Sequence, residues 1–258
     1  MGIYQGYAAV YDASGQIGFS LRMIGYLERL LARHPVAGRS LLELACGTGT
    51  VAIALAQAGW KVIGVDGSSA MLEEARAKPG GDHPAITWQL QDMRALRLPQ
   101  RVHWATCLYD SLNYMLTGED LWQVFRRVYE ALHPGGLFCF DMNTAYALAT
   151  FWDDETYFTD TGDLATIMQS EYDAEHQRAK VTVTCFQRVG ELYRKIVETH
   201  TEQAYPEEQI ATLLRDAGFA VEGRYVCFTF DPPDEATPRI MWAARKPGGR
   251  PRPLNVEG

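Results

Sequence analysis

A glycine-rich stretch is the part of the sequence whose residue types and spacing best suit chemistry. Residues 41–50 have the sequence LLELACGTGT, an apolar run followed by two glycines. Gly47 allows a tight turn, and Gly49 lets the backbone approach a ligand because it has no Cβ. Asp66 lies seventeen positions beyond Gly49, where a carboxylate can accept hydrogen bonds from both hydroxyls of a ribose. The pattern favours a nucleotide-type ligand over a glycine turn that binds nothing.

Acidic residues around this stretch indicate which ligand suits it. Glu43 lies four residues before Gly47 and would repel a pyrophosphate at the N-terminus of the following helix. S-Adenosylmethionine (SAM) carries no phosphate, and a carboxylate at Glu43 can attract its ammonium group directly or through water. Asp92, which ends a third apolar run, can accept a hydrogen bond from the adenine amino group. Three acids around a cationic, phosphate-free cofactor therefore favour SAM over a dinucleotide such as NAD.

These residues need a scaffold that brings the ends of several strands together. Five apolar runs lack polar alternation and predict parallel strands buried on both faces: residues 41–45, 61–66, 86–92, 102–110 and 137–141. Four runs end at an acid: Asp66, Asp92, Asp110 and Asp141. Ligands bind outside the carboxyl ends of such strands, so we expect these acids on the ligand side. Each acid is equally suited to cap a helix or form a turn.

The remaining elements complete the predicted fold. Helical patterns separate the apolar runs and recur near the end of the chain: residues 20–33, 50–58, 68–78, 119–132 and 206–217. With two further strands near residues 221–230 and 239–245, they predict an α/β fold with a Rossmann-like, doubly wound, seven-stranded sheet. Residues 164–173, 179–189 and 192–205 are β-rich and are separated by hairpin loops. They predict a small antiparallel β insertion after the fifth strand.

The composition limits the classes of partner. The 258 residues include 24 Lys and Arg against 32 Asp and Glu, a net charge of −8, so we expect no nucleic-acid partner. Five widely spaced cysteines argue against a disulfide framework or a zinc site, and we expect no metal. The sequence shows no signal-peptide pattern and no apolar run of the ~18 residues that cross a bilayer. We therefore expect a cytoplasmic protein without a membrane partner.

Five segments, in order along the chain, resemble the motifs of class I SAM-dependent methyltransferases. Residues 41–49 resemble the first motif, 62–72 the second and 91–93 the third, while 108–114 occupy the fourth-strand site and 132–136 the turn before the fifth strand. The resemblance covers most of the chain and implies methyl transfer from SAM. It implies a set of cofactor-binding residues, to which the N-terminal segment adds Tyr11. The set is Tyr11, Glu43, Ala45, Gly47, Gly49, Asp66, Gly67, Met71, Asp92, Met93 and Tyr109.

Residues 4–12, with the sequence YQGYAAVYD, are similar to the opening of a narrower subgroup. This subgroup acts on small molecules and includes sugar N,N-dimethyltransferases of macrolide biosynthesis and an uncharacterised bacterial family. In such proteins the N-terminal segment folds over SAM, which makes Tyr11 a candidate cofactor contact; simple packing of the arm is the alternative. The insertion covers the acceptor site in this subgroup and often supports dimerisation, so a homodimer is one expectation.

Candidates for catalysis and acceptor binding lie outside the glycine loop. Among the carboxylates of the motif segments, Asp110 is expected nearest to the site of methyl transfer. It is a candidate general base, and capping of the following turn is the alternative. His200 is a second candidate, because strand alternation puts it on one face with Glu198 and Glu202. That face is a catalytic or acceptor-binding row, a solvent face or a dimer seam. Plain packing is the alternative for four further candidates around the methyl and acceptor region: Tyr109, Asn113, Trp152 and Tyr157.

The sequence thus predicts a SAM-dependent methyltransferase that modifies an N or O atom of a small molecule. Two alternatives stay open: an NAD-dependent oxidoreductase and a catalytically silent SAM-binding assembly module. We divide the chain into an arm and helix that cover the cofactor (1–36), a SAM-binding Rossmann-like domain (37–145 and 205–247), an insertion that forms an acceptor lid or dimer surface (146–204), and a flexible tail (248–258).

Overall fold

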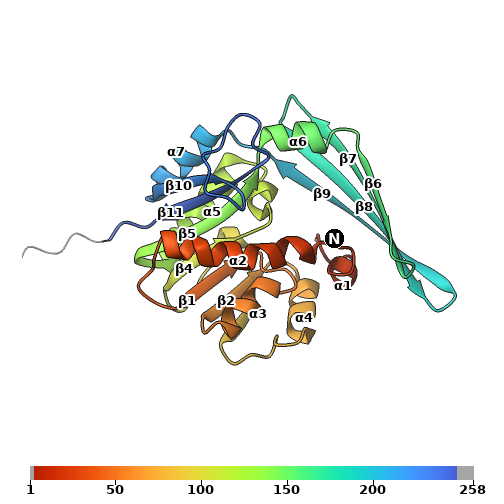
Figure 1. Cartoon of the computed structure of the whole chain (residues 1–258), viewed down its shortest axis with the longest axis horizontal. Coiled ribbons are helices and arrows are strands. Elements are labelled where there is room, and N and C mark those ends of the chain that lie inside the picture. Colours follow the sequence, from red (N-terminus) through yellow and green to blue (C-terminus); the bar gives the residue numbers. More distant parts are fainter. Residues whose placement is uncertain (1–2, 249–258) are drawn as a thin grey trace, which may run out of the picture.

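A computed structural model describes residues 3–248 of the chain. Its main feature is a seven-stranded sheet with the order β10-β11-β5-β4-β1-β2-β3 (Figure 1). The strands are β1 (Ser40–Leu44), β2 (Lys61–Asp66), β3 (Ile86–Leu90), β4 (Val102–Cys107), β5 (Leu132–Asn143), β10 (Ala220–Val226) and β11 (Arg239–Arg245). The first five strands are parallel, and β11 is antiparallel to both of its neighbours. This confirms the predicted fold class.

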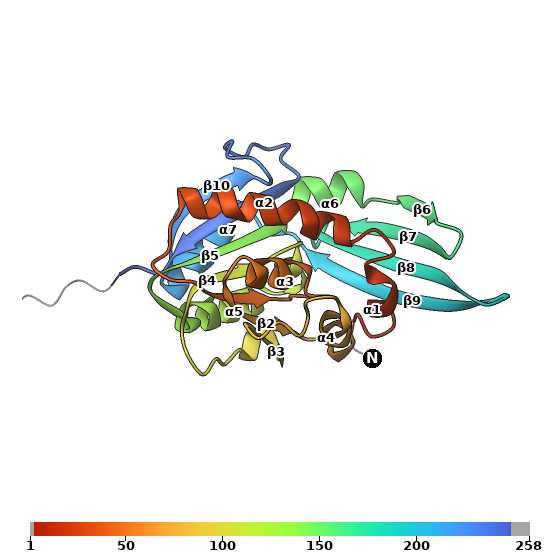
Figure 2. The ribbon, with the colours of Figure 1, turned by 60° about the horizontal axis from the view of Figure 1, so that its bottom comes forward.

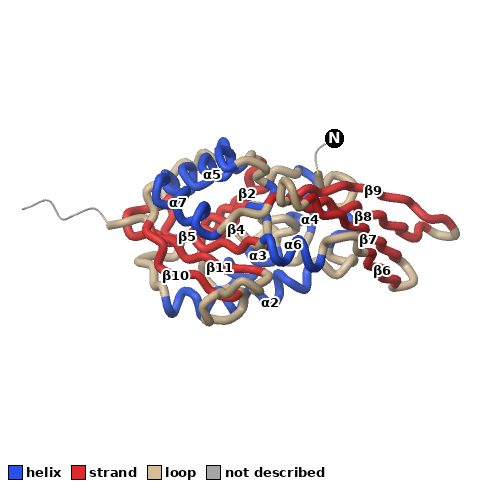
Figure 3. Tube along the Cα trace, turned by 90° about the horizontal axis from the view of Figure 1, so that it is seen from above, coloured by secondary structure: helices blue, strands red, loops and turns tan. Residues whose placement is uncertain are grey.

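Helices cover both faces of this sheet. On one face lie α5 (Gly118–Ala131) and α7 (Glu207–Ala217), and on the other lie α2 (Ile17–Arg33) and α3 (Thr50–Gln57) (Figure 3). Each pair buries its apolar stripe against strand residues that are themselves fully buried, which is the reason the strands lack polar alternation. A fifth helix, α4 (Ser69–Ala77), begins after Ser68, whose side chain accepts a hydrogen bond from the backbone of Met71 as an N-cap.

The strand order reverses between β1 and β4. The chain runs outward from β1 through β2 to β3, and then returns to place β4 and β5 on the other side of β1. In open α/β sheets the carboxyl ends of the strands at such a reversal form the ligand-binding crevice. The glycine loop after β1 and the residues after β2 and β4 therefore lie where a ligand would be bound.

A second sheet has four antiparallel strands in the order β6-β7-β8-β9. These are β6 (Thr156–Asp160), β7 (Leu164–Asp173), β8 (Arg178–Val189) and β9 (Leu192–Gln203). The short helix α6 (Ala145–Phe151) connects β5 to this insertion sheet, which extends away from the body of the molecule (Figure 1). The N-terminal arm, residues 3–16 with the one-turn helix α1 (Ala8–Tyr11), lies between the insertion sheet and α4 (Figure 2).

Several sequence predictions need correction. Two-sided burial is wrong for residues 86–92, because β3 is an edge strand with one neighbour and Leu90 is exposed. Strand β4 ends at Cys107, so Asp110 lies in the loop after it, before the 3-10 turn η2 (Ser111–Tyr114). Strand β6 was not predicted, and β10 ends at Val226 rather than near residue 230. The predicted flexible tail, apart from Gly248, lies outside the described residues. Within residues 3–248 no helix is long and apolar enough to span a membrane.

Candidate active site

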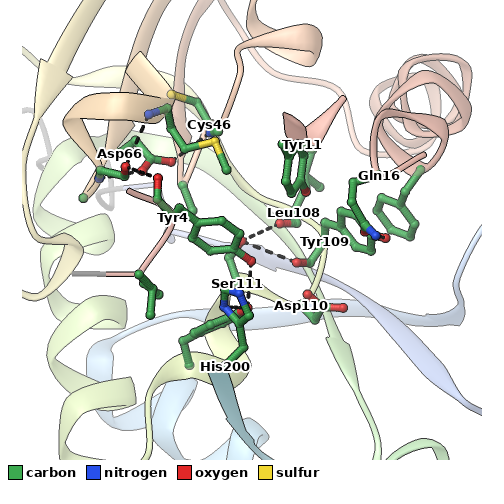
Figure 4. Close-up of a pocket in the computed structure, with 18 of the residues that line it drawn as sticks. Tyr4, Tyr11, Gln16, Cys46, Asp66, Leu108, Tyr109, Asp110, Ser111 and His200 are labelled. Carbon is green, nitrogen blue, oxygen red and sulfur yellow. Dashed lines mark hydrogen bonds between the residues drawn. The ribbon is translucent and has the colours of Figure 1, made fainter. Parts of the chain in front are cut away.

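A cavity of about 700 Å³ lies between the carboxyl ends of the parallel strands and the inner face of the insertion sheet (Figure 4). Most of its lining comes from the N-terminal arm, the glycine loop after β1, the segments after β2, β3 and β4, and the insertion strands β7, β8 and β9, with further residues from α2, β11 and the start of the insertion. The cavity thus joins the predicted cofactor region to the predicted acceptor region in one continuous space.

The glycine loop is held to β2 by Asp66. One carboxylate oxygen of Asp66 accepts a hydrogen bond from the backbone N–H of Gly47 at 2.8 Å, and the other accepts one from Ser68 at 2.8 Å. Burial raises the pKa of Asp66, and these backbone donors oppose that rise. Asp66 is therefore fixed in position at the end of β2 while its carboxylate still lines the cavity.

The two glycines of the loop have different roles. Gly47 has a φ of +54°, lines the cavity, and has open space where a Cβ would point. Gly49 also has a positive φ, +73°, but it does not line the cavity. A Cβ there would lie 2.5 Å from the ring of Trp88 on β3. The expectation that Gly49 makes room for a ligand is therefore wrong, because its missing side chain makes room for Trp88.

Glu43 is buried beneath the loop on β1, with 3% of its surface exposed. Among the described residues its Oε2 atom has no hydrogen-bond partner, although Glu43 lines the cavity. Burial, with a smaller contribution from Asp66, raises the pKa of Glu43 to about 8. A buried carboxyl oxygen without a partner favours a donor or a cation that enters from the cavity.

Asp92 follows β3 and lines the cavity, but its carboxylate already has a partner. Arg94 forms an ion pair with it at 2.6 Å and also donates its backbone N–H at 2.9 Å. Hydrogen bonding to Arg94 keeps the pKa of Asp92 below its usual range. An adenine amino group would therefore share this carboxylate with Arg94, a competition that the sequence did not indicate.

The N-terminal arm is fastened at two points over the cavity. The carboxylate of Glu198 on β9 accepts three backbone N–H groups, from Tyr4 at 2.6 Å, Gly6 at 2.7 Å and Tyr7 at 3.0 Å. At the other end of the arm, Asp12 pairs with Lys78 at 2.6 Å and accepts a hydrogen bond from the glycine-loop residue Thr48 at 2.8 Å. The arm therefore forms one wall of the cavity, and it brings Tyr4, Tyr7 and Tyr11 to the lining.

Aromatic residues and His200 enclose the side of the cavity nearest the insertion. The hydroxyl groups of Tyr4 and Tyr114 are 2.7 Å apart, and the Tyr114 hydroxyl lies 3.2 Å from Nδ1 of His200. The rings of Tyr4 and His200 are 4.7 Å apart. Burial lowers the pKa of His200, which favours the neutral imidazole. The row on β9 thus faces the arm and the cavity rather than solvent.

Asp110 belongs to a buried network of charged residues beside the aromatic residues and His200. Arg239, the first residue of β11, pairs with Asp110 and with Asp141, both at 2.5 Å. The side-chain amide of Asn143 donates to Asp110 at 3.1 Å and to Glu202 at 2.9 Å. Asp141 also accepts the backbone N–H groups of Tyr109 and Asp110, which stabilises this loop even though both residues have positive φ.

The loop after β4 also positions an aromatic wall. Tyr109 stacks on Phe19 of α2 with ring centroids 4.2 Å apart, and its hydroxyl donates to Gln16 at 2.7 Å. Trp152 and Tyr157 from the start of the insertion line the far part of the cavity. Asn113 does not line it, because its amide bonds the backbone of Asn143 and Gln203 within the core. The prediction of Asn113 near the methyl group is therefore wrong.

Comparison with known proteins agrees with this geometry. A family model described as a methyltransferase domain matches residues 41–136. The protein named "Putative methyltransferase YqeM" of Bacillus subtilis (strain 168) is 31% identical over 245 residues, which cover 95% of this chain and 97% of that protein. A solved SAM-dependent methyltransferase from Clostridium acetobutylicum ATCC 824 has a TM-score of 0.83 at 25% identity and covers 94% of this chain and 98% of its own. The chain belongs to the SAM-dependent methyltransferases.

A further relative of this methyltransferase has a more specific name. The dTDP-4-amino-2,3,4,6-tetradeoxy-D-glucose N,N-dimethyltransferase of Saccharopolyspora spinosa is 26% identical over 226 residues, 84% of each chain. The comparisons give no support to an NAD-dependent oxidoreductase or to a catalytically silent module. SAM is therefore the cofactor of this methyltransferase, as predicted from the acids around the glycine loop.

The described residues of the methyltransferase fit SAM. Bound SAM supplies an electrophilic methyl group on a positively charged sulfur. The unpartnered Oε2 atom of Glu43 suits a positively charged group, and the Asp66 carboxylate suits hydroxyl donors. Gly47 leaves open space beside both of them. By holding both reactants in one cavity, the protein can align the acceptor with the methyl group, and such alignment can supply roughly 7–11 kcal/mol of catalysis.

The structure brings nearly all of the predicted site residues together. Apart from Gly49, every predicted cofactor-binding or catalytic residue lines the cavity: Tyr11, Glu43, Ala45, Gly47, Asp66, Gly67, Met71, Asp92, Met93, Tyr109, Asp110 and His200. The sequence did not assign Tyr4, Tyr114 or Arg239. Tyr4 and Tyr114 lie in the motif segments that carried the resemblance, but no pattern distinguished Arg239 from any charged residue that begins a strand.

Proposed function

We propose that this methyltransferase transfers the methyl group of SAM to the amine nitrogen of a small molecule. The cofactor lies against the glycine loop, Asp66 and Asp92, under the N-terminal arm. The acceptor enters the part of the cavity between the arm and the insertion sheet, beside Tyr4 and His200. In this assignment residues 146–204 form the wall of the acceptor site and residues 1–36 cover the cofactor.

The charge of the cavity lining is the main support for an amine acceptor. The described lining includes five carboxyl side chains and only two guanidinium groups: Glu43, Asp66, Asp92, Asp110 and Glu202 against Arg94 and Arg239. Both arginines are already ion-paired with aspartates. This excess of acid suits a cationic cofactor and an acceptor that arrives as an ammonium ion. Relatives named as dTDP-amino-sugar N,N-dimethyltransferases support an amine nitrogen as the acceptor atom.

The same charge pattern argues against a nucleotide-activated acceptor bound by its diphosphate. A diphosphate needs unpaired Lys or Arg side chains, or clustered backbone N–H groups. Within residues 3–248 the cavity lining contains no Lys, and each of its two arginines pairs with an aspartate. We therefore propose a small amine without a diphosphate as the acceptor. Asp110 and His200 are the proposed groups through which protons leave the acceptor region.

A product screen tests this function. The enzyme is incubated with SAM and with pairs of amines and alcohols that share one carbon skeleton, amino sugars included. Mass spectrometry then detects the added methyl group. We expect methylated amines and no methylated alcohol within each pair, with SAM consumed in equal amount. Methylation of alcohols alone would contradict the assignment of nitrogen as the acceptor atom, while leaving the family membership intact.

A further inference from the structure

The carboxyl group of Glu202 is the acid of the cavity that has neither a counter-ion nor a proposed role in cofactor binding. It lies one residue before the end of β9, with 2% of its surface exposed, and it lines the cavity. Its Oε2 atom accepts a hydrogen bond from the amide of Asn143 at 2.9 Å. Within residues 3–248 its Oε1 atom accepts no hydrogen bond, and no Lys or Arg pairs with it.

The charges behind Glu202 do not balance. Asp110, Asp141 and Glu202 are buried together, and Arg239 is the cation among them. Arg239 pairs with both aspartates, and Asn143 links Asp110 to Glu202 without adding charge. Burial and the nearby Asp110 raise the pKa of Glu202 well above its usual range. Glu202 therefore holds a proton until a cation reaches it from the cavity.

Among residues 3–248, the other elements packed against this part of the cavity add no second positive charge. The arm contributes Tyr4, η2 contributes Tyr114, and β9 contributes His200. Burial raises the pKa of both tyrosines and lowers that of His200, so all three are neutral. Their rings enclose the space with aromatic faces, which attract cations. An ammonium ion would complete both the charge balance and the aromatic enclosure.

We propose that Glu202 binds the protonated amine of the methyl acceptor and takes its proton before methyl transfer. This proposal rests on the amine methyltransferase function proposed above. The arriving ammonium displaces the proton that Glu202 holds in the free enzyme, and this proton passes to solvent. One N–H bond of the ammonium then breaks, its proton forms an O–H bond with Glu202 Oε1, and nitrogen keeps the electron pair. That pair forms the bond to the methyl carbon as the carbon–sulfur bond breaks and its electrons go to sulfur. Glu202 then returns the proton to solvent.

The kinetic test compares wild type with Glu202→Gln, using the amine with the highest turnover in the product screen. Glutamine keeps an acceptor for Asn143 but cannot take a proton. At about pH 7 we expect the KM for the amine to rise at least tenfold, whereas the affinity for SAM changes less than about twofold. Wild type gives a bell-shaped profile of kcat/KM against pH, since both an ionised Glu202 and a protonated amine are needed. The variant loses the alkaline limb, and its rate rises with pH as the fraction of free amine increases.

The control is Glu171→Gln, which changes an exposed glutamate of the same sheet that pairs with Lys180. It should leave KM and the pH profile unchanged. An unaltered KM and an unaltered bell-shaped profile in Glu202→Gln would overturn the proposal. Thermal melting of both variants shows whether Glu202→Gln is folded. If it does not fold, Glu202→Asp, which keeps the charge on a shorter side chain, takes its place and should show raised KM with the bell shape retained.

A binding test needs no turnover. Tetramethylammonium chloride is titrated into the protein loaded with S-adenosylhomocysteine, the demethylated product of SAM, and aromatic NMR signals report binding. We expect binding to wild type and to Glu171→Gln, binding at least tenfold weaker to Glu202→Gln, and no binding of the neutral analogue tert-butanol. Equal binding to wild type and Glu202→Gln, or none to wild type, would overturn the proposal. A screen without methylated amines would refute the proposed function, and this titration would still decide on Glu202 as a cation site.

Discussion

At the scale of single residues, the carboxyl groups around the cavity differ in what stabilises their charge. Asp66 accepts two backbone N–H groups, Asp92 pairs with Arg94, and Asp110 pairs with Arg239. Glu43 has an unpartnered buried oxygen atom among the described residues. Carboxyl groups with protein partners are fixed in position and can offer a ligand their remaining lone pairs, whereas an unpartnered buried oxygen atom can take a new donor or cation. Each type gives a different response to substitution.

Replacing Asp66 tests the ribose end of the cofactor site. We expect Asp66→Ala to weaken SAM binding by about 1.5–3 kcal/mol, because charged hydrogen bonds to the cofactor hydroxyls are lost. The substitution also frees the N–H groups of Gly47 and Ser68, so the loop loses its link to β2. Isothermal titration calorimetry with SAM measures the change. An unchanged dissociation constant would remove Asp66 from the site.

The raised pKa of Glu43 predicts that SAM binding releases a proton. Its pKa is raised to about 8, so at about pH 7 the free protein holds a proton there. A cationic ammonium beside the carboxyl favours its ionised form, so SAM binding lowers the pKa and releases the proton. SAM affinity should therefore increase as the pH rises from about 6 toward 7.5. Calorimetry in buffers of different ionisation enthalpy measures the number of protons released.

Two variants sharpen this measurement. Glu43→Gln should abolish the proton release, because the amide does not titrate. Asp92→Asn is the matched control: Arg94 lowers the pKa of Asp92, so that carboxyl is already ionised before SAM binds. Its removal should leave the release unchanged. Equal proton release in wild type and Glu43→Gln would show that the cofactor ammonium is not bound by Glu43.

We expect substitution of Arg239 to cause a large loss of stability. Arg239→Met leaves Asp110 and Asp141 buried without their cation, which should reduce the free energy of unfolding by about 3–5 kcal/mol at neutral pH. The control is Arg224→Met, which breaks a partly exposed pair with Glu207 and should cost no more than about 1 kcal/mol. Urea denaturation measures both. A similar small loss in the two variants would show that the buried pair contributes little.

At the scale of elements, the N-terminal arm depends on strand β9. Glu198 accepts three arm N–H groups, and hydrogen bonds to a charged group contribute about 1.5–3 kcal/mol each in favourable cases. We expect Glu198→Ala to speed amide hydrogen exchange at Tyr4, Gly6 and Tyr7 at least tenfold and to weaken SAM binding. Glu171→Ala, on an exposed part of the insertion sheet, is the control. Unchanged exchange in Glu198→Ala would mean that other contacts hold the arm.

The sequence predicted the elements that have strong local patterns. Strands such as β1 and β2 have continuous apolar runs because both faces are covered by helices. Strand β6 escaped prediction because all five of its residues are exposed and its only neighbour is β7. Strand β5 begins at Leu132, which pairs with Val102 of β4, but the register to β4 shifts before Leu137 and Gly135 has a φ of +79°. The turn predicted from the sequence HPGG is therefore an irregularity inside this strand.

The site residues that lie at strand ends could be predicted from the sequence. The contacts between segments far apart in the chain could not. Glu43, Asp66 and Asp92 follow from the parallel sheet, since the carboxyl ends of neighbouring strands converge. The contacts of Asp110 with Arg239 and of Tyr4 with Glu198 join residues more than one hundred positions apart. No local pattern encodes such pairs. Gly49 shows the converse error, because a familiar glycine position serves the packing of Trp88.

At the scale of the whole molecule, two sheets line one cavity and supply different groups to it. The seven-stranded sheet supplies the glycine loop and the strand-end acids, and the insertion sheet supplies the row that includes His200 and Glu202. The arm connects the two across the cavity and contributes three tyrosines to its lining. Carboxyl groups thus outnumber guanidinium groups in the lining, where they suit a cationic cofactor and a cationic acceptor.

Transfer of an isotopically labelled methyl group tests the central claim most directly. The enzyme receives SAM with a CD3 group and an equal mixture of an amine and the alcohol of the same carbon skeleton, chosen from the pairs described above. Mass spectrometry then locates the label. We expect CD3 on the nitrogen of the amine and none on the alcohol, and at least tenfold less CD3-amine with Glu202→Gln at neutral pH and an amine concentration below KM. Label on the alcohol oxygen and none on nitrogen would contradict the central claim.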